Sequence, residues 1–369
     1  MLDPKVIREQ KLIVKKHCTE RGVNSQIVDK WIQVDKEKRE LQIEIDNINS
    51  LRKSSKKLSS KERKSIRDKK DQLKTFKQKM NVLNNRWDEL INQIPNLHSD
   101  DVPLGKTDKD NVVIQEAKID RKIGLEIKDH YDLAVSGDLI DFERGAKVAA
   151  SQFYYTKNEL VLLELAVIQF VLDFVIKKGY KPIQTPDLAK SRYYKGTGYN
   201  PKGDESQTYE IDGEDLGLIA TAEITMAGYH ADEIISLEDL PLKYIAMSHC
   251  FRKEAGAYGK YSKGLYRTHQ FTKLEMFVYS SKEDSHKYHE EILQIEKELM
   301  EELDIPYRVL EMCTGDLGGM AAKKYDIEAW LPGRGDFGEV TSTSNCLDYQ
   351  ARNLNIRNKN KDGKNEYIH

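Results

Sequence analysis

The chain has 369 residues, enough for more than one domain and for a large buried core. Charged residues make up 33% of it, yet the net charge is only −2. This balance excludes a uniformly basic nucleic-acid-binding protein, so the distribution of charge along the chain matters more than its sum.

The four cysteines, Cys18, Cys250, Cys313 and Cys346, are widely spaced and form no CxxC pair. This spacing argues against a zinc knuckle and against a disulfide framework, and predicts reduced thiols in a cytoplasmic protein. Residues 1–14 mix charges throughout, so no signal peptide is predicted.

The most apolar stretch runs from 160 to 176, where Glu164, Gln169 and Asp173 interrupt it on one side. A membrane span would be apolar all round. We therefore predict a buried helix with a polar stripe, and no membrane partner.

Two heptad seams in the first hundred residues predict a pair of long helices. In each seam, the seam residues are alternately four and three positions apart. The second seam begins with one step of seven positions before this alternation starts. The serine-rich segment 54–60 separates the seams, and Pro95 ends the second. We predict an antiparallel helical hairpin within an N-terminal domain of residues 1–98. Its seam positions are Ile27, Trp31, Val34, Lys38, Leu41, Ile45 and Ile48, then Ile66, Leu73, Phe76, Met80, Leu83, Trp87, Leu90 and Ile94.

The hairpin carries a one-sided charge. Residues 51–86 hold fourteen Lys or Arg against three Asp or Glu, a local excess of eleven positive charges. A solvated coiled-coil face is one interpretation, although such faces usually mix both signs. A phosphate-binding arm is the other, and the charge pattern alone leaves both open.

The rest of the chain predicts a linker and then a mixed domain. Residues 99–112 are polar and contain Pro103 and Gly105, which is typical of a linker. Within 113–369 we predict a long helix over 160–177 and an amphipathic helix over 285–303. Short apolar runs between Gly-rich turns predict an antiparallel β-sheet, and the polar segment 353–364 a loop. The fold class is therefore α+β.

The stretch 244–279 predicts a strand, a glycine-containing loop and a second strand. Side chains alternate in a strand, so Thr272, Leu274, Met276 and Val278 share an apolar face. Arg267, His269, Phe271, Lys273 and Glu275 share the other. Cations, a carboxylate and a ring on one face can hold a nucleotide. A surface hairpin with cross-strand ion pairs is the alternative.

These residues also carry a family resemblance. The segments 251–256 (FRKEAG), 264–271 (GLYRTHQF) and 273–275 (KLE) resemble motif 2 of class II aminoacyl-tRNA synthetases in its seryl form. The segments 139–148 (LIDFERGAKV), 179–186 (GYKPIQTP, similar to motif 1), 196–198 (GTG), 221–223 (TAE) and 341–346 (TSTSNC) also resemble that family, in the same order. The resemblance implies a class II catalytic core behind a tRNA-binding hairpin, and a homodimer.

The resemblance further implies site residues. Serine would be bound by Thr221, Ala222, Glu223 and Glu275, and catalytic roles fall to Arg252, Glu254 and Glu275. ATP would contact Arg252, Lys253, Glu254, Thr268, His269, Gln270, Phe271, Glu339, Val340, Thr341 and Ser342. The tRNA would contact Lys53, Lys56, Lys57, Arg63, Lys64, Arg67 and Lys70. No dedicated metal site is predicted; Mg²⁺ would bridge the phosphates of ATP.

The implied reaction has two steps. The serine carboxylate attacks the α-phosphorus of ATP, and a ribose hydroxyl of tRNA(Ser) then takes the seryl group; whether tRNA(Sec) is also a partner stays open. Positioning and charge neutralisation carry such a reaction without a protein nucleophile.

Two departures qualify this prediction. Lys253 stands where the family usually has a small polar residue. In the family a further motif, with a strand and a helix, follows the position of His369. Three interpretations remain: an incomplete copy that needs that segment, which we favour, a chain that works with a second fragment, or a non-catalytic tRNA-binding paralogue. A ligase for carrier proteins is disfavoured, because such relatives lack the long basic arm.

Overall fold

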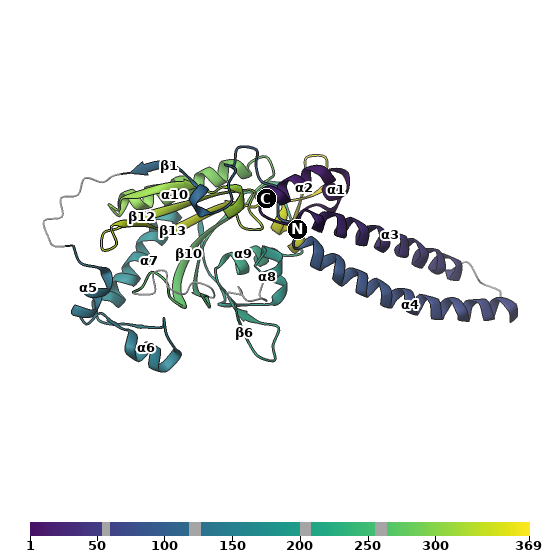
Figure 1. The fold of residues 1–369 in the computed structure, drawn as a ribbon, viewed down its shortest axis with the longest axis horizontal. Helices are drawn as coiled ribbons and strands as arrows, with labels where there is room; N and C mark the ends of the chain where they lie inside the picture. The colour runs from purple at the N-terminus through teal and green to yellow at the C-terminus, as the bar shows by residue number, and fades with distance from the viewer. Residues whose placement is uncertain (54–59, 118–126, 200–207, 255–263) are drawn as a thin grey trace. The chain divides into compact units, whose positions relative to one another are not determined.

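The computed structural model describes residues 1–53, 60–117, 127–199, 208–254 and 264–369, with residues 51–53 and 60–71 described as backbone only. The chain divides into two compact units, Met1–Leu97 and His98–His369 (Figure 1). Residues 99–112, predicted as a linker, belong to the second unit: Ser99 N donates to Ala322 O and Val102 is buried there.

The first unit is helical. Helices α1 (Pro4–Glu9) and α2 (Lys11–Glu20) precede the long helices α3 (Gln26–Lys53) and α4 (Ser60–Ile91), which pack on each other as an antiparallel hairpin (Figure 1). Asp3 caps α1, with its carboxylate accepting from Lys5 N, and Pro4 occupies the first turn, where no backbone donor is needed.

The predicted heptad seam is confirmed where side chains are described. A core along α3 and α4 buries Val34, Leu41, Ile45, Ile48, Leu73 and Leu83, with Phe76, Met80, Trp87 and Leu90 packed against it. The polar member Lys38 lies over the Trp87 ring, 4.5 Å from its centroid, so a cation is accommodated in the seam. Helix α4 ends at Ile91, before Pro95.

The second unit is built around two larger sheets. One has the order β1 (Val112–Ala117), β11 (Tyr307–Glu311), β12 (Lys323–Leu331) and β13 (Asp336–Asn345), all antiparallel. The other has the order β10 (Gln270–Tyr279), β9 (Leu242–Phe251) and β4 (Lys181–Gln184), with β4 parallel to β9. The predicted strand pair is therefore confirmed as β9 and β10, and the predicted antiparallel sheet as the first sheet.

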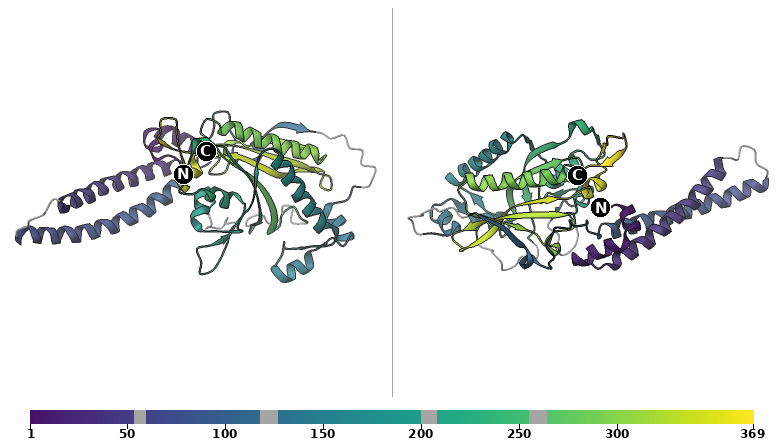
Figure 2. Two further views of the ribbon diagram at one scale, coloured as in Figure 1. Left: turned by 180° about the vertical axis from the view of Figure 1, so that it is seen from behind. Right: turned by 90° about the horizontal axis from the view of Figure 1, so that it is seen from above.

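Two long helices cover these sheets. Helix α10 (Ser285–Glu302) lies along one face of β12 and β13, and α7 (Glu159–Lys177) packs on β4, β9 and β10 (Figure 2). A shared apolar core includes Val175, Ile245, Leu299, Val309 and Ile327. Both predicted helices are confirmed, and α7 is followed by Gly179 at a positive φ of 89°.

Smaller elements complete the second unit. The short helices are α5 (His130–Ser136), α6 (Phe142–Ala149), α8 (Ser191–Thr197), α9 (Glu223–Tyr229) and α11 (Tyr349–Leu354), with 3₁₀ turns at Asp108–Asp110, Leu237–Asp239 and Thr314–Asp316. The short strands form three small sheets. In the first, β2 (Ile140–Asp141) pairs with β3 (Tyr155–Thr156); in the second, β7 (Gly217–Leu218) lies between β5 (Leu188–Ala189) and β6 (Tyr209–Glu210). In the third, β14 (Arg357–Lys359) lies between β8 (Ile234–Ile235) and β15 (Asn365–Tyr367).

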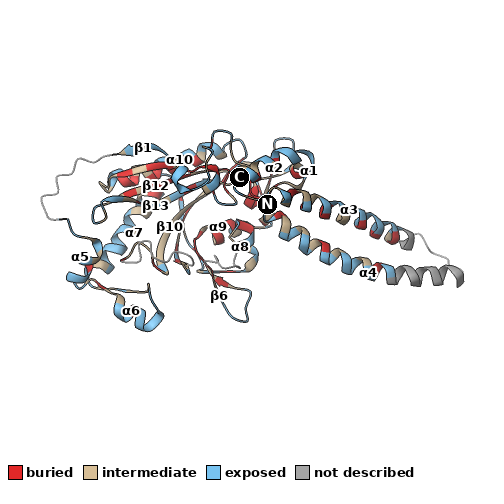
Figure 3. Ribbon diagram, in the orientation of Figure 1, coloured by how far each residue is buried: buried red, intermediate tan, exposed pale blue. Residues whose placement is uncertain are grey.

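Two predictions were wrong. Helix α7 is not buried: Leu162 is 66% exposed, Leu163 and Leu165 are both 58% exposed, and the helix is largely exposed (Figure 3). Its apolar residues surround the helix, and the sheet contacts only one side of it. The segment 353–364 is not a loop throughout, because β14 lies within it and pairs with β15 despite its polar sequence. In the part of the chain that the structure describes, no helix combines the length and apolarity that a membrane crossing requires.

Candidate active site

A cavity of about 1380 Å³ opens between the edge strands β10 and β13. The helices α7 and α10 contribute apolar side chains to it, and the loops around residues 220, 252 and 267 contribute polar ones. Beside β10, the backbone of Ser280 exchanges two hydrogen bonds with His369, at 2.8 and 3.1 Å. The cavity brings together most of the residues predicted to bind serine and ATP.

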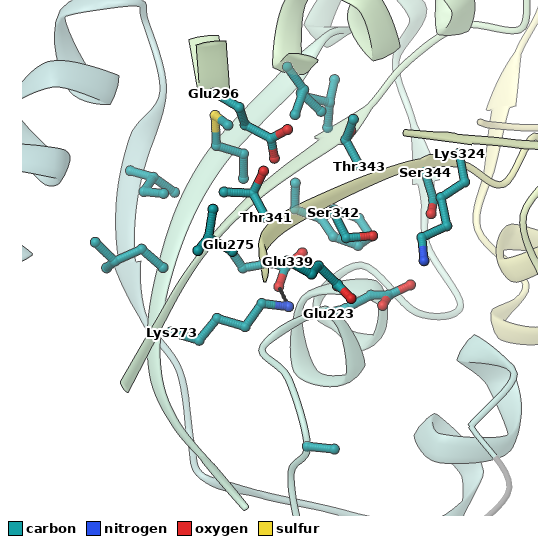
Figure 4. Close-up of a pocket in the computed structure, with 18 of the residues that line it drawn as sticks. Glu223, Lys273, Glu275, Glu296, Lys324, Glu339, Thr341, Ser342, Thr343 and Ser344 are labelled. Carbon is teal, nitrogen blue, oxygen red and sulfur yellow. Dashed lines mark ion pairs between the residues drawn. The ribbon is translucent and has the colours of Figure 1, made fainter. Parts of the chain in front are cut away.

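Strand β10 sorts its side chains as the alternation predicted. Leu274, Met276 and Val278 pack against the apolar core. On the other face, Lys273 and Glu275 form an ion pair (Figure 4). Burial is the largest single effect and lowers the pKa of the Lys273 ammonium. The effects that raise this pKa, chiefly those of Glu275, are larger in total, so the pKa lies above its ordinary value. Lys273 therefore keeps its positive charge inside the cavity.

Thr221 joins this ion pair from a distant part of the sequence. Its fully buried hydroxyl donates to Glu275 Oε2 (2.9 Å) and accepts from Lys273 Nζ (3.0 Å) and from the backbone N of Glu223 (3.2 Å). All hydrogen-bonding capacity of the hydroxyl is used, so the three side chains are held in one arrangement. Ala222 is buried at the start of α9 and packs into the core.

Glu223 is the second carboxylate of this cluster. Its Oε1 accepts from Gln350 Nε2 (2.7 Å), and its Oε2 accepts from the Tyr199 hydroxyl (3.1 Å). Burial and then the Glu275 charge raise the pKa of Glu223, while the Gln350 hydrogen bond opposes them. Two carboxylates and one ammonium leave a net negative charge, which suits a second cation.

Arg252 lies just beyond the end of β9, beside the same cluster. Its Nε donates to Ala220 O (3.3 Å), and its guanidinium lies over the Phe271 ring, 5.1 Å from the centroid. Within the described part of the chain, the cation–ring contact and the backbone bond leave other guanidinium N–H groups available to an anion. The planar guanidinium can donate two parallel hydrogen bonds, so Arg252 in this position suits a phosphate.

The two residues after Arg252 contact other side chains near the site. Lys253 lies over the Tyr209 ring at 5.7 Å, and Glu254 has a φ of 49°, which is unusual for a side chain other than glycine. Glu254 Oε2 accepts from Arg267 Nη1 (2.6 Å). This ion pair ties the two flanks of the loop together.

The remaining motif 2 residues brace the base of β10. His269 Nδ1 lies 2.7 Å from Arg252 O and 2.9 Å from the Tyr209 hydroxyl, and its ring stacks on Phe153 at 5.3 Å. Thr268 donates from Oγ1 to Gln270 O, and Gln270 is exposed. The His269 ring is thus engaged with protein groups that fix the position of Arg252.

A bulge in β13 decides which of its side chains share a face. Glu328 pairs with Glu339, but Ile327 pairs with Thr341, so exposed Val340 is an extra residue. Glu339 and Ser342 therefore lie on one face, and Thr341 lies on the opposite face, beside Glu296 of α10 (Figure 4). A regular strand would place Glu339 with Thr341 instead.

The Glu339 face supplies the oxygen ligands that Mg²⁺ prefers. Asp326, which pairs with Ser342, has a pKa raised to about 6, first by burial and then by Glu339, against a lowering by Lys324. Neighbouring carboxylates that repel each other are a donor set that fits a divalent cation.

Three residues of the cluster were not predicted as site residues. The sequence predicted Lys273 on the polar face of β10 but gave it no role in binding. Tyr199 follows the GTG segment, and Gln350 follows the TSTSNC segment by four residues. Their proximity to resemblance motifs was the available signal, but only the folded chain brings them to Glu223.

The predicted tRNA-binding side chains lie outside the described residues. Lys56 and Lys57 fall in the segment between α3 and α4, and the other five lie on backbone-only parts of those helices. They are Lys53, Arg63, Lys64, Arg67 and Lys70.

Comparison with known proteins agrees with this geometry. Residues 1–98 match the seryl-tRNA synthetase N-terminal domain, and residues 207–369 match the tRNA synthetase class II core domain (G, H, P, S and T). A serine–tRNA ligase of Dictyoglomus turgidum is 48% identical over 379 residues, which cover 100% of this chain and 89% of that protein.

The chain belongs to the seryl-tRNA synthetase family.

Solved structures place the fold in the same family. The seryl-tRNA synthetase of Pyrococcus horikoshii complexed with ATP has a TM-score of 0.86 and 39% identity, covering 100% of this chain and 90% of that one. The cytoplasmic serine–tRNA ligase of Naegleria fowleri in complex with AMP has a TM-score of 0.84 and 32% identity, covering 100% and 89%. The predicted family and its α+β class II fold are confirmed.

Proposed function

We propose that this chain is a serine–tRNA ligase, which activates serine with ATP and transfers it to the 3′ end of tRNA(Ser). The observation that carries the proposal is the cluster of Thr221, Glu223, Lys273 and Glu275 beside Arg252 in one cavity. Family membership supports it, and the chain acts in the cytoplasm under this proposal.

The carboxylates account for serine binding. The serine ammonium lies between Glu223 and Glu275, where it offsets the net negative charge of the cluster. The serine hydroxyl takes a place among the same polar groups. Alanine would leave those groups without a partner, so a polar pocket of this kind rejects it.

Arg252 and Phe271 account for ATP binding. The guanidinium of Arg252 neutralises the α-phosphate as the serine carboxylate attacks it, and Phe271 stacks on the adenine. Glu254 contributes a contact to the adenine end, while Lys253, Thr268, His269, Gln270 and Val340 line or brace the nucleotide. Glu339 and Ser342 would hold Mg²⁺, which neutralises phosphate charge when it is bound.

The N-terminal hairpin binds the tRNA in this proposal. The excess of positive charge over residues 51–86 supports it. Replacing Lys56 and Lys57 by alanine is expected to weaken binding of tRNA(Ser) and to reduce its salt dependence, whereas replacing the exposed Lys16 and Lys36 is not. The same titration with a tRNA(Sec) transcript shows whether the chain also accepts that tRNA.

A homodimer is the assembly that fits α7. The exposed apolar face of α7 lies beside β4, the edge strand of its sheet, and a second copy would cover both. Leu162→Glu is expected to convert a dimer to a monomer in sedimentation velocity. Val82→Glu is the matched control, because Val82 and Leu162 are both 66% exposed. A parent chain that sediments as a monomer would contradict the assembly.

An added strand between β10 and β13 completes the site in this proposal. Among the described residues both strands lie at the edges of their sheets, and this position together with the cavity between them supports it. Such a strand would join the two sheets and cover apolar side chains of α7 and α10.

The test is serine-dependent ATP–pyrophosphate exchange by two proteins. One is this chain; the other is this chain extended by the residues that follow the equivalent of His369 in the Dictyoglomus turgidum relative. We expect exchange only by the extended chain. Exchange by both would make the chain sufficient by itself and would contradict the need for the added strand. If neither exchanges while tRNA still binds, a non-catalytic tRNA-binding protein is the better description.

A further inference from the structure

Glu223 is held in place by two residues that belong neither to the TAE segment nor to β10. Gln350 Nε2 donates to Glu223 Oε1 (2.7 Å), and the Tyr199 hydroxyl donates to Oε2 (3.1 Å). Each carboxylate oxygen therefore has one protein donor and still has lone-pair capacity for a ligand. The two donors hold the carboxylate from both sides.

Gln350 is itself fixed by a second hydrogen bond. Its side-chain Nε2 also donates to Thr197 O (3.1 Å), and the residue is only 8% exposed. Since an amide nitrogen has two hydrogens, both are used, one on a backbone carbonyl and one on Glu223. The amide can neither rotate nor withdraw without losing one of them.

The GTG segment, residues 196–198, has a role in this arrangement. Asn353 Nδ2 of α11 donates to Gly196 O (2.9 Å), and Leu354 occupies the space that a side chain at position 196 would need, 2.4 Å from an added Cβ. The segment therefore seats α11 through backbone carbonyls and close packing, and α11 presents Gln350 to Glu223.

The surroundings of Glu223 explain why it needs two donors. Glu275 is the nearby like charge, and Lys273, on the same strand as Glu275, is the opposing cation. Burial and Glu275 both favour protonation of Glu223, and among the effects that oppose them the Gln350 hydrogen bond is the largest. A protonated Glu223 could not attract an ammonium group.

We propose that Gln350 and Tyr199 are positioning residues for serine recognition, which hold Glu223 ionised and in the rotamer that receives the serine ammonium. The inference rests on the proposed function and adds to it the residues that set the affinity for serine. Among the described residues, the side-chain hydrogen bonds of Gln350 and Tyr199 go to Thr197 and Glu223, and none goes to Arg252 or Phe271 on the nucleotide side. Their removal therefore weakens serine binding and leaves ATP binding unchanged.

The test compares variants at Gln350 with a matched control. Gln350→Met keeps the volume and removes the donor; Gln350→Glu keeps the shape and places a carboxylate against Glu223. Tyr199→Phe removes only the hydroxyl. The control is Gln294→Met, because Gln294 is an exposed glutamine of α10 that likewise donates to a glutamate, Glu298, away from the cavity. Affinities for serine and for ATP are measured by calorimetry on this chain, and KM and kcat by exchange on the extended chain.

The expected result separates serine from ATP. Loss of a hydrogen bond to a charged group corresponds to about 10- to 100-fold, so Gln350→Met is expected to raise the Kd and KM for serine by that factor. Gln350→Glu is expected to be at least as harmful, and Tyr199→Phe to cost less, about 3- to 10-fold. ATP affinity and kcat change less than about twofold, and Gln294→Met behaves as the parent. A packing role alone would leave Gln350→Glu close to the parent.

Three outcomes would overturn the inference. The first is a serine affinity within twofold of the parent for both Gln350 variants and Tyr199→Phe. The second is an equal loss of ATP and serine affinity in well-folded Tyr199→Phe, which would indicate general disturbance of the cavity. The third is a parent, in both lengths, that binds no serine; that result also removes the proposed function, whereas the first two leave it intact.

Discussion

The two walls of the cavity differ in how completely their polar groups are paired. On the serine wall, Thr221, Glu223 and Glu275 have hydrogen-bond or ion-pair partners within the chain. On the opposite wall, Glu296 Oε2 and Thr341 Oγ1 are buried but have no hydrogen-bond partner with acceptable geometry among the described residues. A buried polar atom without a partner is destabilising, typically by about 1–3 kcal/mol.

This difference indicates which part of the site is already built. The serine wall is preorganised, because its side chains are fixed before any ligand arrives. The wall formed by α10 and β13 has a cavity beside it and unpaired polar atoms facing that cavity. We expect substitutions on the first wall to affect serine recognition, and those on the second wall to affect stability.

Glu275→Gln is expected to have the largest effect. The variant removes the charge that pairs with Lys273 and weakens the acceptor of Thr221, so a buried ammonium loses its partner. Serine-dependent exchange by the extended chain is expected to fall by about 10³-fold or more. Glu298→Gln, at a half-buried position of α10 outside the cavity lining, should retain parental exchange. Activity of Glu275→Gln within tenfold of the parent would contradict the assignment of the serine wall.

Glu296→Gln is expected to change stability in a pH-dependent way. Burial raises the pKa of Glu296 from its ordinary value near 4.5 to about 8. The folded chain therefore keeps a proton that the unfolded chain loses, and this residue's contribution to stability declines as pH rises from about 4.5 to about 8. The glutamine variant should nearly match the parent near pH 5 and gain on the order of 4 kcal/mol relative to it at pH 8 to 9.

Denaturant unfolding at a series of pH values measures this effect. Glu290→Gln is a matched control on the same helix. A constant difference between Glu296→Gln and the parent across pH 5 to 9 would show that Glu296 is not protonated in the folded chain.

Two threonine substitutions provide the smallest and most symmetrical comparison. Thr221→Val removes a hydroxyl with three partners, and is expected to destabilise the chain by about 2 kcal/mol. Thr341→Val removes a buried hydroxyl without a partner of good geometry, and is expected to stabilise the chain by about 1 kcal/mol. Urea unfolding of both variants at pH 7 measures the difference. Equal losses would remove the distinction between the walls.

The sequence predicted which faces of the hairpin helices and of β10 are buried. It did not predict which residues far apart in the chain come into contact at the site. The heptad residues of α3 and α4 and the alternation along β10 could be read directly, because local periodicity determines which face is buried. The partners of Glu223 could not, since Tyr199 and Gln350 are distant in sequence and only the packing of α8 on α11 brings them together. The burial of α7 was predicted wrongly because apolar composition does not specify which surface covers a helix.

Within the candidate site, motif resemblance identified residue types but not their orientation. Glu339, Thr341 and Ser342 were predicted together as ATP contacts, yet the bulge at Val340 places Thr341 on the other face. Bulges depend on the pairing of two strands, which a single strand's sequence does not display.

Discrimination between serine and alanine tests the central claim most directly. The measurement is kcat/KM for each amino acid in ATP–pyrophosphate exchange by the extended chain. Because the polar groups of the serine wall are left unpaired by alanine, we expect a preference for serine of at least about 10³-fold. Comparable values for the two amino acids would contradict the claim that Thr221, Glu223 and Glu275 form a serine-binding site.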